Sequence, residues 1–236
     1  MKRNLVAASL LALTVACPLR AQQPYTIYPI PQQMVPGSGT ATLSKTVNVV
    51  CEAGIDQYTR DRASQVLADH GLTTQFSDAA SSQMTNLYLG INGSNGTADA
   101  HATSLGLSRD VFAKDGKYDR HLLSIANAGG HADIVALGEN TDATFYALAS
   151  LEQILDNSTE TLTAVTIYDY ADQKSRGLVE GYYGYPYSID VKKDLMRFMM
   201  RYKMNTYLYG AKSDPYHSNY WKNPYPTSIK IGRAHV

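Results

Sequence analysis

Gly-Leu-Val-Glu-Gly-Tyr-Tyr-Gly-Tyr-Pro-Tyr-Ser (177–188) and Met-Asn-Thr-Tyr-Leu-Tyr-Gly-Ala-Lys-Ser-Asp-Pro-Tyr-His-Ser-Asn-Tyr-Trp (204–221) are the two segments that decide the fold of this chain. The first opens with a short apolar run, which predicts a buried strand over 176–181 that ends where glycines permit a tight turn. The second opens with aromatic and β-branched residues over 205–209 and stops at Gly210, which predicts another strand.

A helix is expected between these two strands. Ser188 is a favourable N-cap, Asp190 lies in the first turn, and apolar residues recur at helical spacing as far as Tyr202. A helical crossover of this length favours parallel pairing of the strands that it connects. The polar residues after both strands are therefore expected at one edge, where active sites are built in such folds.

Val-Glu-Gly-Tyr-Tyr-Gly (179–184), Met-Asn-Thr-Tyr-Leu-Tyr-Gly-Ala-Lys (204–212) and Asp-Pro-Tyr-His (214–217) together resemble the opening of the barrel in glycoside hydrolase family 84. These are the β-N-acetylglucosaminidases often called O-GlcNAcases, some of them labelled hyaluronidases. The preceding part of the chain fits the small domain that stands before the barrel in that family. The resemblance implies an α/β fold class, with a small α+β N-terminal domain over 22–170 followed by the truncated start of a TIM (β/α)8 barrel over 171–230.

The resemblance also implies three substrate-binding residues. Gly181 would contact sugar hydroxyls through its backbone, Tyr183 would line the sugar pocket, and Lys212 would donate hydrogen bonds to the sugar. Taken alone, Gly181 is a turn glycine and Lys212 is a solvated lysine, so the functional interpretation depends on the surrounding pattern. Asp214, which precedes a proline, is interpreted as a turn former.

Some positions depart from the family pattern. The family usually has Phe at the position of Tyr182, Trp at Tyr187, and Asp at Ser213, so a role for Ser213 is in doubt. His217 has no second histidine at ligand spacing, so neither a metal site nor a cofactor is expected.

The reaction that the resemblance implies is hydrolysis with retention, in which the 2-acetamido oxygen of the substrate attacks the anomeric carbon. Two adjacent aspartates would divide the work: one orients the acetamide, and the other protonates the leaving oxygen. The chain contains no two consecutive carboxylate residues, so no catalytic residue is assigned. The 61 residues from Arg176 to Val236 are far fewer than the roughly 250 of a complete barrel. We therefore expect a fragment that ends before the aspartate pair and is inactive by itself.

The two ends of the chain carry further signals. Lys2 and Arg3 precede an apolar run over 5–16 that is too short to span a bilayer, which predicts a signal peptide over 1–21 and a secreted or periplasmic protein. A lipoprotein anchored through Cys17 is the alternative.

At the other end, residues 231–236 (Ile-Gly-Arg-Ala-His-Val) back-translate as ATC GGA AGA GCA CAC GTC, a common sequencing-library adapter. The hypothesis is that this segment is an assembly artefact; a natural segment is the alternative.

The small domain has mixed elements. Strands are expected near 25–30, 47–51, 84–91 and 165–168, a hairpin near 122–126 and 134–137 about Gly129 and Gly130, and helices near 55–70 and 141–156. His101, His121 and His131 are scattered, and we expect them to be exposed. No chemistry stands out in this domain, and its expected task is to brace the barrel.

Charge limits the partners. The chain has 21 basic and 21 acidic residues, and removal of residues 1–21 leaves 18 basic residues against 21 acidic ones. Nucleic acid is therefore not an expected partner, because that binding draws on clustered Lys and Arg. The expected partner is a glycan or glycoprotein that contains N-acetylglucosamine.

Two alternatives to the enzyme remain open. The first is a non-catalytic carbohydrate-binding or adhesion module. The second is a family 20 hexosaminidase, which shares the small leading domain and the assisting acetamide but uses an Asp-Glu pair. The turn over 180–184 argues against the second alternative.

Overall fold

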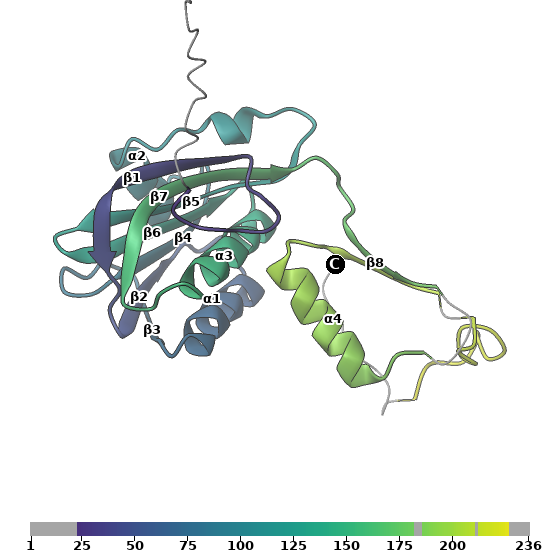
Figure 1. Cartoon of the computed structure of the whole chain (residues 1–236). Coiled ribbons are helices and arrows are strands. Elements are labelled where there is room, and N and C mark those ends of the chain that lie inside the picture. The colour runs from purple at the N-terminus through teal and green to yellow at the C-terminus, as the bar shows by residue number, and fades with distance from the viewer. Residues whose placement is uncertain (1–22, 182–185, 211, 227–236) are drawn as a thin grey trace, which may run out of the picture.

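The computed structural model describes residues 23–181, 186–210 and 212–226. It shows a seven-stranded sheet with its helices, here called the sheet domain (23–171), and a strand–helix–strand segment, here called the βαβ unit (176–210) (Figure 1). Tyr183 and the predicted signal peptide over 1–21 lie outside the described residues, as does the segment 231–236.

The strands of the sheet domain are β1 (Gln33–Thr42), β2 (Thr46–Cys51), β3 (Thr73–Ser77), β4 (Asn86–Ile91), β5 (Tyr118–Ala128), β6 (His131–Gly138) and β7 (Thr161–Ala171). They follow the order β1-β7-β5-β6-β4-β2-β3. The pairs β1–β7, β7–β5 and β5–β6 are antiparallel, and β6, β4, β2 and β3 run parallel. The β5–β6 hairpin turns at Gly129 and Gly130, whose positive φ angles of 65° and 103° favour glycine, as predicted.

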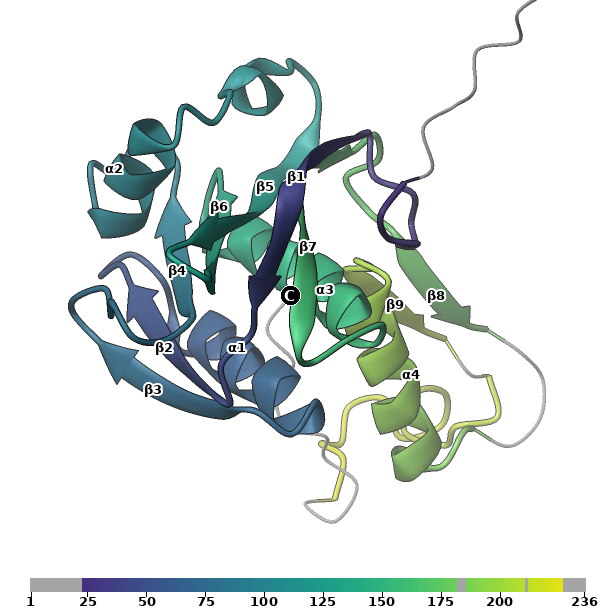
Figure 2. The same ribbon diagram turned by 60° about the vertical axis from the view of Figure 1, so that its left-hand side comes forward.

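Helices cover both faces of this sheet. α1 (Gln57–Asp69) and α3 (Thr141–Leu155) cover one face, where Leu67 and Leu148 join a continuous apolar core (Figure 2). α2 (Thr97–Ser104) packs through two alanines on the other face, and a short 3-10 turn, η1 (Asp110–Ala113), follows it. The predicted helices near 55–70 and 141–156 are therefore confirmed, and both begin at a side-chain cap, Asp56 and Asn140.

The strand predicted near 25–30 is wrong, because these residues form no strand. Tyr25 and Ile27 are buried in the core instead, and the Tyr25 hydroxyl donates a hydrogen bond to the Thr163 carbonyl at 3.0 Å. The apolar run therefore packs against the sheet without pairing with it.

The βαβ unit confirms the predicted order of strand, helix and strand. β8 (Gly177–Glu180) and β9 (Thr206–Tyr209) are parallel, and α4 (Ile189–Arg201) connects them. The Ser188 hydroxyl accepts a hydrogen bond from the Val191 amide at 3.3 Å, so it caps α4 as expected. This is the repeat from which a (β/α)8 barrel is built, while the complete barrel stays a prediction. No helix in the described part of the chain is long and apolar enough to cross a membrane.

Candidate functional site

The carboxyl ends of β8 and β9 lie side by side. Glu180 pairs in register with Tyr209, and the Gly210 amide donates a hydrogen bond to the Glu180 carbonyl at 2.8 Å. Gly181 directly follows β8, and Lys212 follows Gly210 by two residues. The structure therefore brings these two predicted site residues to the same edge of the two strands, whereas Tyr183 cannot be placed.

Gly181 is exposed, and its backbone does not require glycine. Its φ angle lies outside the positive range, and the nearest described atom to an added Cβ would be Val179 Cγ1 at 3.3 Å. A methyl group needs only a small adjustment of that flexible side chain. The turn by itself therefore does not explain the glycine, which fits the close approach of a ligand to the backbone.

The carboxylate of Glu180 is buried, with 1% of the residue exposed. Its Oε1 accepts a hydrogen bond from the Tyr187 amide at 2.9 Å, and its Oε2 accepts one from the Tyr207 hydroxyl. The Lys192 ammonium lies 3.5 Å from Oε2. Glu180, the last residue of β8, thus links Tyr187 to β9 through Tyr207 and to α4 through Lys192.

Asp214 has the same role in the turn after β9. Its carboxylate accepts hydrogen bonds from the Tyr209 hydroxyl, from the Tyr216 amide at 2.8 Å and from the Tyr225 hydroxyl at 3.1 Å. Burial pushes its pKa up, but these hydrogen bonds outweigh that effect and hold the pKa below its ordinary value. The interpretation of Asp214 as a turn former is confirmed, and the turn that it organises carries Lys212.

The two carboxylates are linked through one lysine. The Lys192 ammonium lies 4.0 Å from the centroid of the Tyr209 ring, whose hydroxyl bonds Asp214. Burial, followed by the hydrogen bond to Asp214, raises the pKa of Tyr209, so this hydroxyl stays protonated and donates. A continuous network of Glu180, Lys192, Tyr209 and Asp214 therefore joins the loops that carry Gly181 and Lys212.

A cleft of about 570 Å³ opens beside this network, between the start of α4 and the turn after β9. Tyrosines 187, 209, 216 and 225 are among the residues that line it. Tyrosine offers an apolar face and a polar tip, which suits contact with sugars.

Glu180 and Lys192 were not among the site residues predicted from the sequence. A glutamate at the end of an apolar strand was a usable signal, because an ionised side chain is seldom fully buried unless it is paired. Its partners, however, lie 7 to 27 residues away along the chain and become apparent only after folding. Within the described ranges, no group of three His, Cys, Asp or Glu side chains is arranged to hold a metal ion.

Two family models match the chain. Residues 24–170 match the model of glycosyl hydrolase family 20, domain 2, and residues 176–230 match the model of beta-N-acetylglucosaminidase. Among curated proteins, the Protein O-GlcNAcase of Rattus norvegicus and that of Mus musculus are each 41% identical over 49 residues. That region covers 21% of this chain and 5% of each relative.

Solved structures extend this similarity to most of the chain. CpGH84D matches with a TM-score of 0.77 at 38% identity, and CpGH84B with a TM-score of 0.62 at 27% identity. Both comparisons cover 86% of this chain and 33% of the other. A GH20 exo β-N-acetylglucosaminidase from Vibrio harveyi, at 15% identity and a TM-score of 0.56 over 79% of this chain and 25% of its own, shows a shared fold.

The chain spans 33% of the length of the family 84 structures that it matches. The family 20 domain 2 model covers more than half of the chain, and the beta-N-acetylglucosaminidase model covers the βαβ unit that carries the candidate site. The resemblance seen in the sequence is thereby confirmed: the chain is a family 84 β-N-acetylglucosaminidase-like fragment, and its leading domain belongs to the glycosyl hydrolase family 20, domain 2 type.

Proposed function

We propose that this chain contributes part of the sugar-binding site, at the ends of β8 and β9, to a glycosidase that releases β-linked N-acetylglucosamine from glycoconjugates. The observation that carries the proposal is the common position of Gly181 and Lys212 at the carboxyl ends of two parallel, hydrogen-bonded strands. That edge is where sites form in barrels of this kind. The match of residues 176–230 to the beta-N-acetylglucosaminidase model supports the choice of an N-acetylglucosamine glycoside as substrate.

The division of labour follows from the chemistry of the two residues. The exposed backbone of Gly181 has room for a hydroxyl to approach, and the Lys212 ammonium offers up to three hydrogen-bond donors. The network of Glu180, Lys192, Tyr209 and Asp214 holds Tyr187 and the turn at Asp214 in place before the sugar arrives, which lowers the entropy lost on binding. The proposed reaction retains the anomeric configuration, with the substrate's own acetamide as nucleophile.

Residues 1–236 alone are proposed to be inactive. Orienting the acetamide and protonating the leaving oxygen require two carboxylates in the site. The sequence holds no consecutive pair, while Glu180 and Asp214 are committed to backbone amides and tyrosines. In this view, the chain binds and orients the sugar, and the acid–base groups come from elsewhere in the protein.

The decisive test compares this chain with an extended protein, the product of the complete reading frame of the gene that encodes residues 1–230. Both are purified and assayed with a nitrophenyl N-acetylglucosaminide. We expect turnover by the extended protein and none by residues 1–236. Turnover by the short chain would refute the proposed inactivity, and an extended protein that is folded but inert would refute the enzyme.

A carbohydrate-binding module is the second candidate, because the chain has the proposed binding residues without two consecutive carboxylate residues. Saturation-transfer NMR with N-acetylglucosamine separates the two. If the extended protein binds the sugar without hydrolysing it, and Lys212→Ala abolishes that binding, the module is the correct assignment.

Secretion is a further part of the proposal. It rests on the basic residues and the apolar run at the N-terminus. The mass of the mature protein separates cleavage after Ala21 from acylation at Cys17, and an intact Met1 would exclude both.

A further inference from the structure

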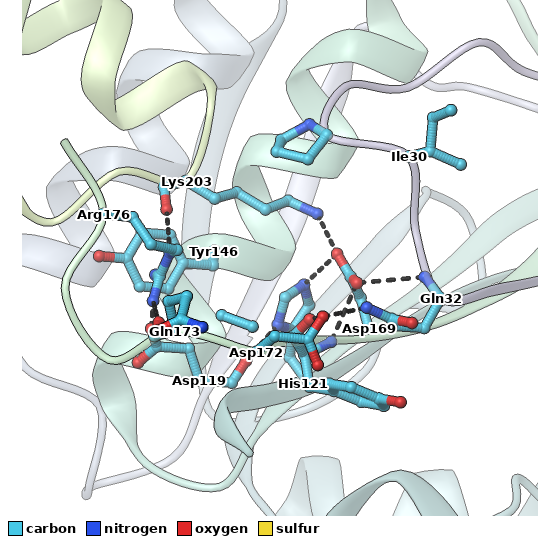
Figure 3. A pocket seen from close by; sticks show the side chains of 13 residues that line it. Ile30, Gln32, Asp119, His121, Tyr146, Asp169, Asp172, Gln173, Arg176 and Lys203 are labelled. Carbon is cyan, nitrogen blue, oxygen red and sulfur yellow. Dashed lines mark hydrogen bonds and ion pairs between the residues drawn. The ribbon is translucent and has the colours of Figure 1, made fainter.

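His121, on β5, was expected to be exposed, but the structure buries it between the sheet domain and the βαβ unit. Only 2% of the residue is exposed. It lines a cavity of about 270 Å³ together with Asp119 and Asp169 of the sheet domain and Arg176 and Lys203 of the βαβ unit (Figure 3). The expectation was wrong because His121 lies beside Asp169 at a cavity that residues of both regions line.

The hydrogen bonding of His121 fixes its tautomer. Its Nδ1 lies 2.7 Å from the backbone carbonyl oxygen of Asp119, which only accepts, so Nδ1 carries a proton. In the neutral ring, Nε2 is then a bare acceptor. It has no hydrogen-bond partner among the described residues and lies 3.7 Å from the Asp169 Oδ2. Two acceptors therefore face each other in a buried site.

The same oxygen of Asp169 also forms an ion pair with the βαβ unit. The Lys203 ammonium donates to Oδ2 at 2.6 Å, and both side chains are 8% exposed. The other oxygen, Oδ1, accepts from the backbone amides of Gln32 at 3.2 Å and Tyr170 at 2.9 Å. The Asp169 carboxylate thus accepts hydrogen bonds from one ammonium group and two backbone amides, and the neutral His121 ring lies beside it.

The ion pairs that link the sheet domain to the βαβ unit share one polarity. Arg176 bonds Asp119 at 2.6 Å, and Arg201 pairs with Asp156 and lies 3.7 Å from Glu152. In each of these pairs, as in the pair of Lys203 with Asp169, the cation comes from the βαβ unit and the carboxylate from the sheet domain. A new positive charge on the sheet-domain side therefore opposes docking.

We propose that protonation of His121 weakens the interface between the sheet domain and the βαβ unit. The neutral ring leaves the ion pair of Asp169 with Lys203 intact. The protonated ring competes with Lys203 for Asp169 and so weakens the attachment of the βαβ unit. Protonation adds a cation to a buried site where Lys203 already neutralises Asp169, and low polarity strengthens the repulsion between the two cations. The titratable and charged groups that line the cavity with His121 come from several elements: Asp119 on β5, whose carbonyl oxygen accepts from the ring, Tyr146 on α3, Asp169 and Tyr170 on β7, Asp172 just after β7, and Arg176 and Lys203 of the βαβ unit.

The direction of the pH effect follows from the environment of the ring. Burial, with a further contribution from the Lys203 ammonium, lowers the pKa of His121 from 6.5 to about 4. The open state, in which the ring regains water, binds more protons between these two values. Acidification from pH 6.5 to 4 therefore favours opening by up to roughly tenfold for each pH unit. Below that window Asp169 adds to the loss, because burial raises its pKa but the nearby charges and hydrogen bonds, Lys203 first among them, together outweigh burial and hold the pKa below its ordinary value.

Amide hydrogen exchange of the intact chain at pH 7, 6 and 5, corrected for intrinsic rates, measures this opening. Protection of the segment 176–209 should fall several-fold to tenfold per pH unit while the core of β4 and β6 keeps its protection. His121→Asn retains an amide donor for the Asp119 carbonyl and cannot be protonated. In this variant, the hydrogen-exchange protection of segment 176–209 should therefore depend much less on pH. His131→Asn, the same change at a half-buried histidine far from the interface, should respond to pH as the parent does.

Three results would overturn the proposal: equal pH dependence in the parent and His121→Asn, parallel loss of protection in β4 and β6, or an NMR titration that gives His121 an ordinary pKa near 6.5. The titration uses the unaltered chain and decides the question even if His121→Asn fails to fold. The experiment involves no sugar and no turnover, so its outcome is independent of the proposed enzymatic activity.

Discussion

The sheet domain and the βαβ unit are stabilised in different ways. The sheet domain has a core of fully buried aliphatic side chains between its sheet and two helices. In the βαβ unit, only Met199 among the described apolar residues is buried, while Val179 and Leu208 are 70% and 58% exposed. What is buried there is polar: Glu180 and Lys203. Hydrophobic burial therefore stabilises one region, whereas ion pairs and hydrogen bonds position the other.

The largest effect is expected at the ion pair between the two regions. Lys203→Met keeps most of the aliphatic stem but leaves the Asp169 carboxylate buried without its cation, and breaking such a pair costs about 3–5 kcal/mol. The loss should appear as reduced hydrogen-exchange protection of segment 176–209. The double variant Lys203→Met, Asp169→Asn removes both charges and should recover much of the loss. A single variant that keeps full protection would show that this ion pair does not dock the unit.

Core packing should dominate in the sheet domain. Leu148→Ala removes a fully buried side chain from α3, and a truncation of this kind costs about 2–5 kcal/mol. The matched control is Val179→Ala in the βαβ unit, an exposed position where the free energy of unfolding should change by about 0.5 kcal/mol or less. Urea unfolding followed by circular dichroism measures both. Equal losses would remove the distinction between the two regions.

The sequence predicted the elements whose pattern is strong and local. The helices at 57–69 and 141–155 have side-chain caps and apolar periodicity, and the β5–β6 hairpin has two glycines at its turn. β1 was missed because its sequence contains Pro36 and Gly37 and most of its residues are exposed. β3 was missed because its sequence, TTQFS, is largely polar. These strands exist because neighbours pair with them, which a local pattern does not report.

The same distinction applies to the site. The shared edge of Gly181 and Lys212 was predictable because two strands joined by a helical crossover pair in parallel. The Glu180 network was not, since its members come together only after β8, α4 and β9 have packed. The surroundings of the buried His121 likewise include Arg176 and Lys203, which lie more than 50 residues further along the chain. Charge networks are thus harder to read from sequence than apolar periodicity.

A moderate effect is expected at Glu180, where the polar interior of the βαβ unit is tested directly. Glu180→Gln keeps the size and one acceptor but removes the negative charge beside Lys192, and loss of a charged hydrogen-bond partner costs about 1–3 kcal/mol. Tyr187, whose amide bonds Oε1, should exchange its amide proton faster. Glu180→Leu should cost more, since it removes the acceptor that Glu180 provides to the Tyr207 hydroxyl and to the Tyr187 amide. If Gln and Leu behave alike, the carboxylate does not organise the loop.

The smallest effect on stability, and the sharpest on function, is expected at Gly181. The added methyl group of Gly181→Ala meets only Val179 Cγ1 at 3.3 Å among the described atoms, so the free energy of unfolding should change by less than about 1 kcal/mol. If the exposed backbone is the sugar contact, the same methyl group blocks the approach of a hydroxyl. In the extended protein, the KM for a nitrophenyl N-acetylglucosaminide should then rise at least tenfold, which corresponds to about 1.4 kcal/mol of binding free energy. Lys212→Ala provides the comparison, because it removes a donor from an exposed side chain without adding bulk. A turn glycine would give the opposite result for Gly181→Ala, with reduced stability and unchanged KM.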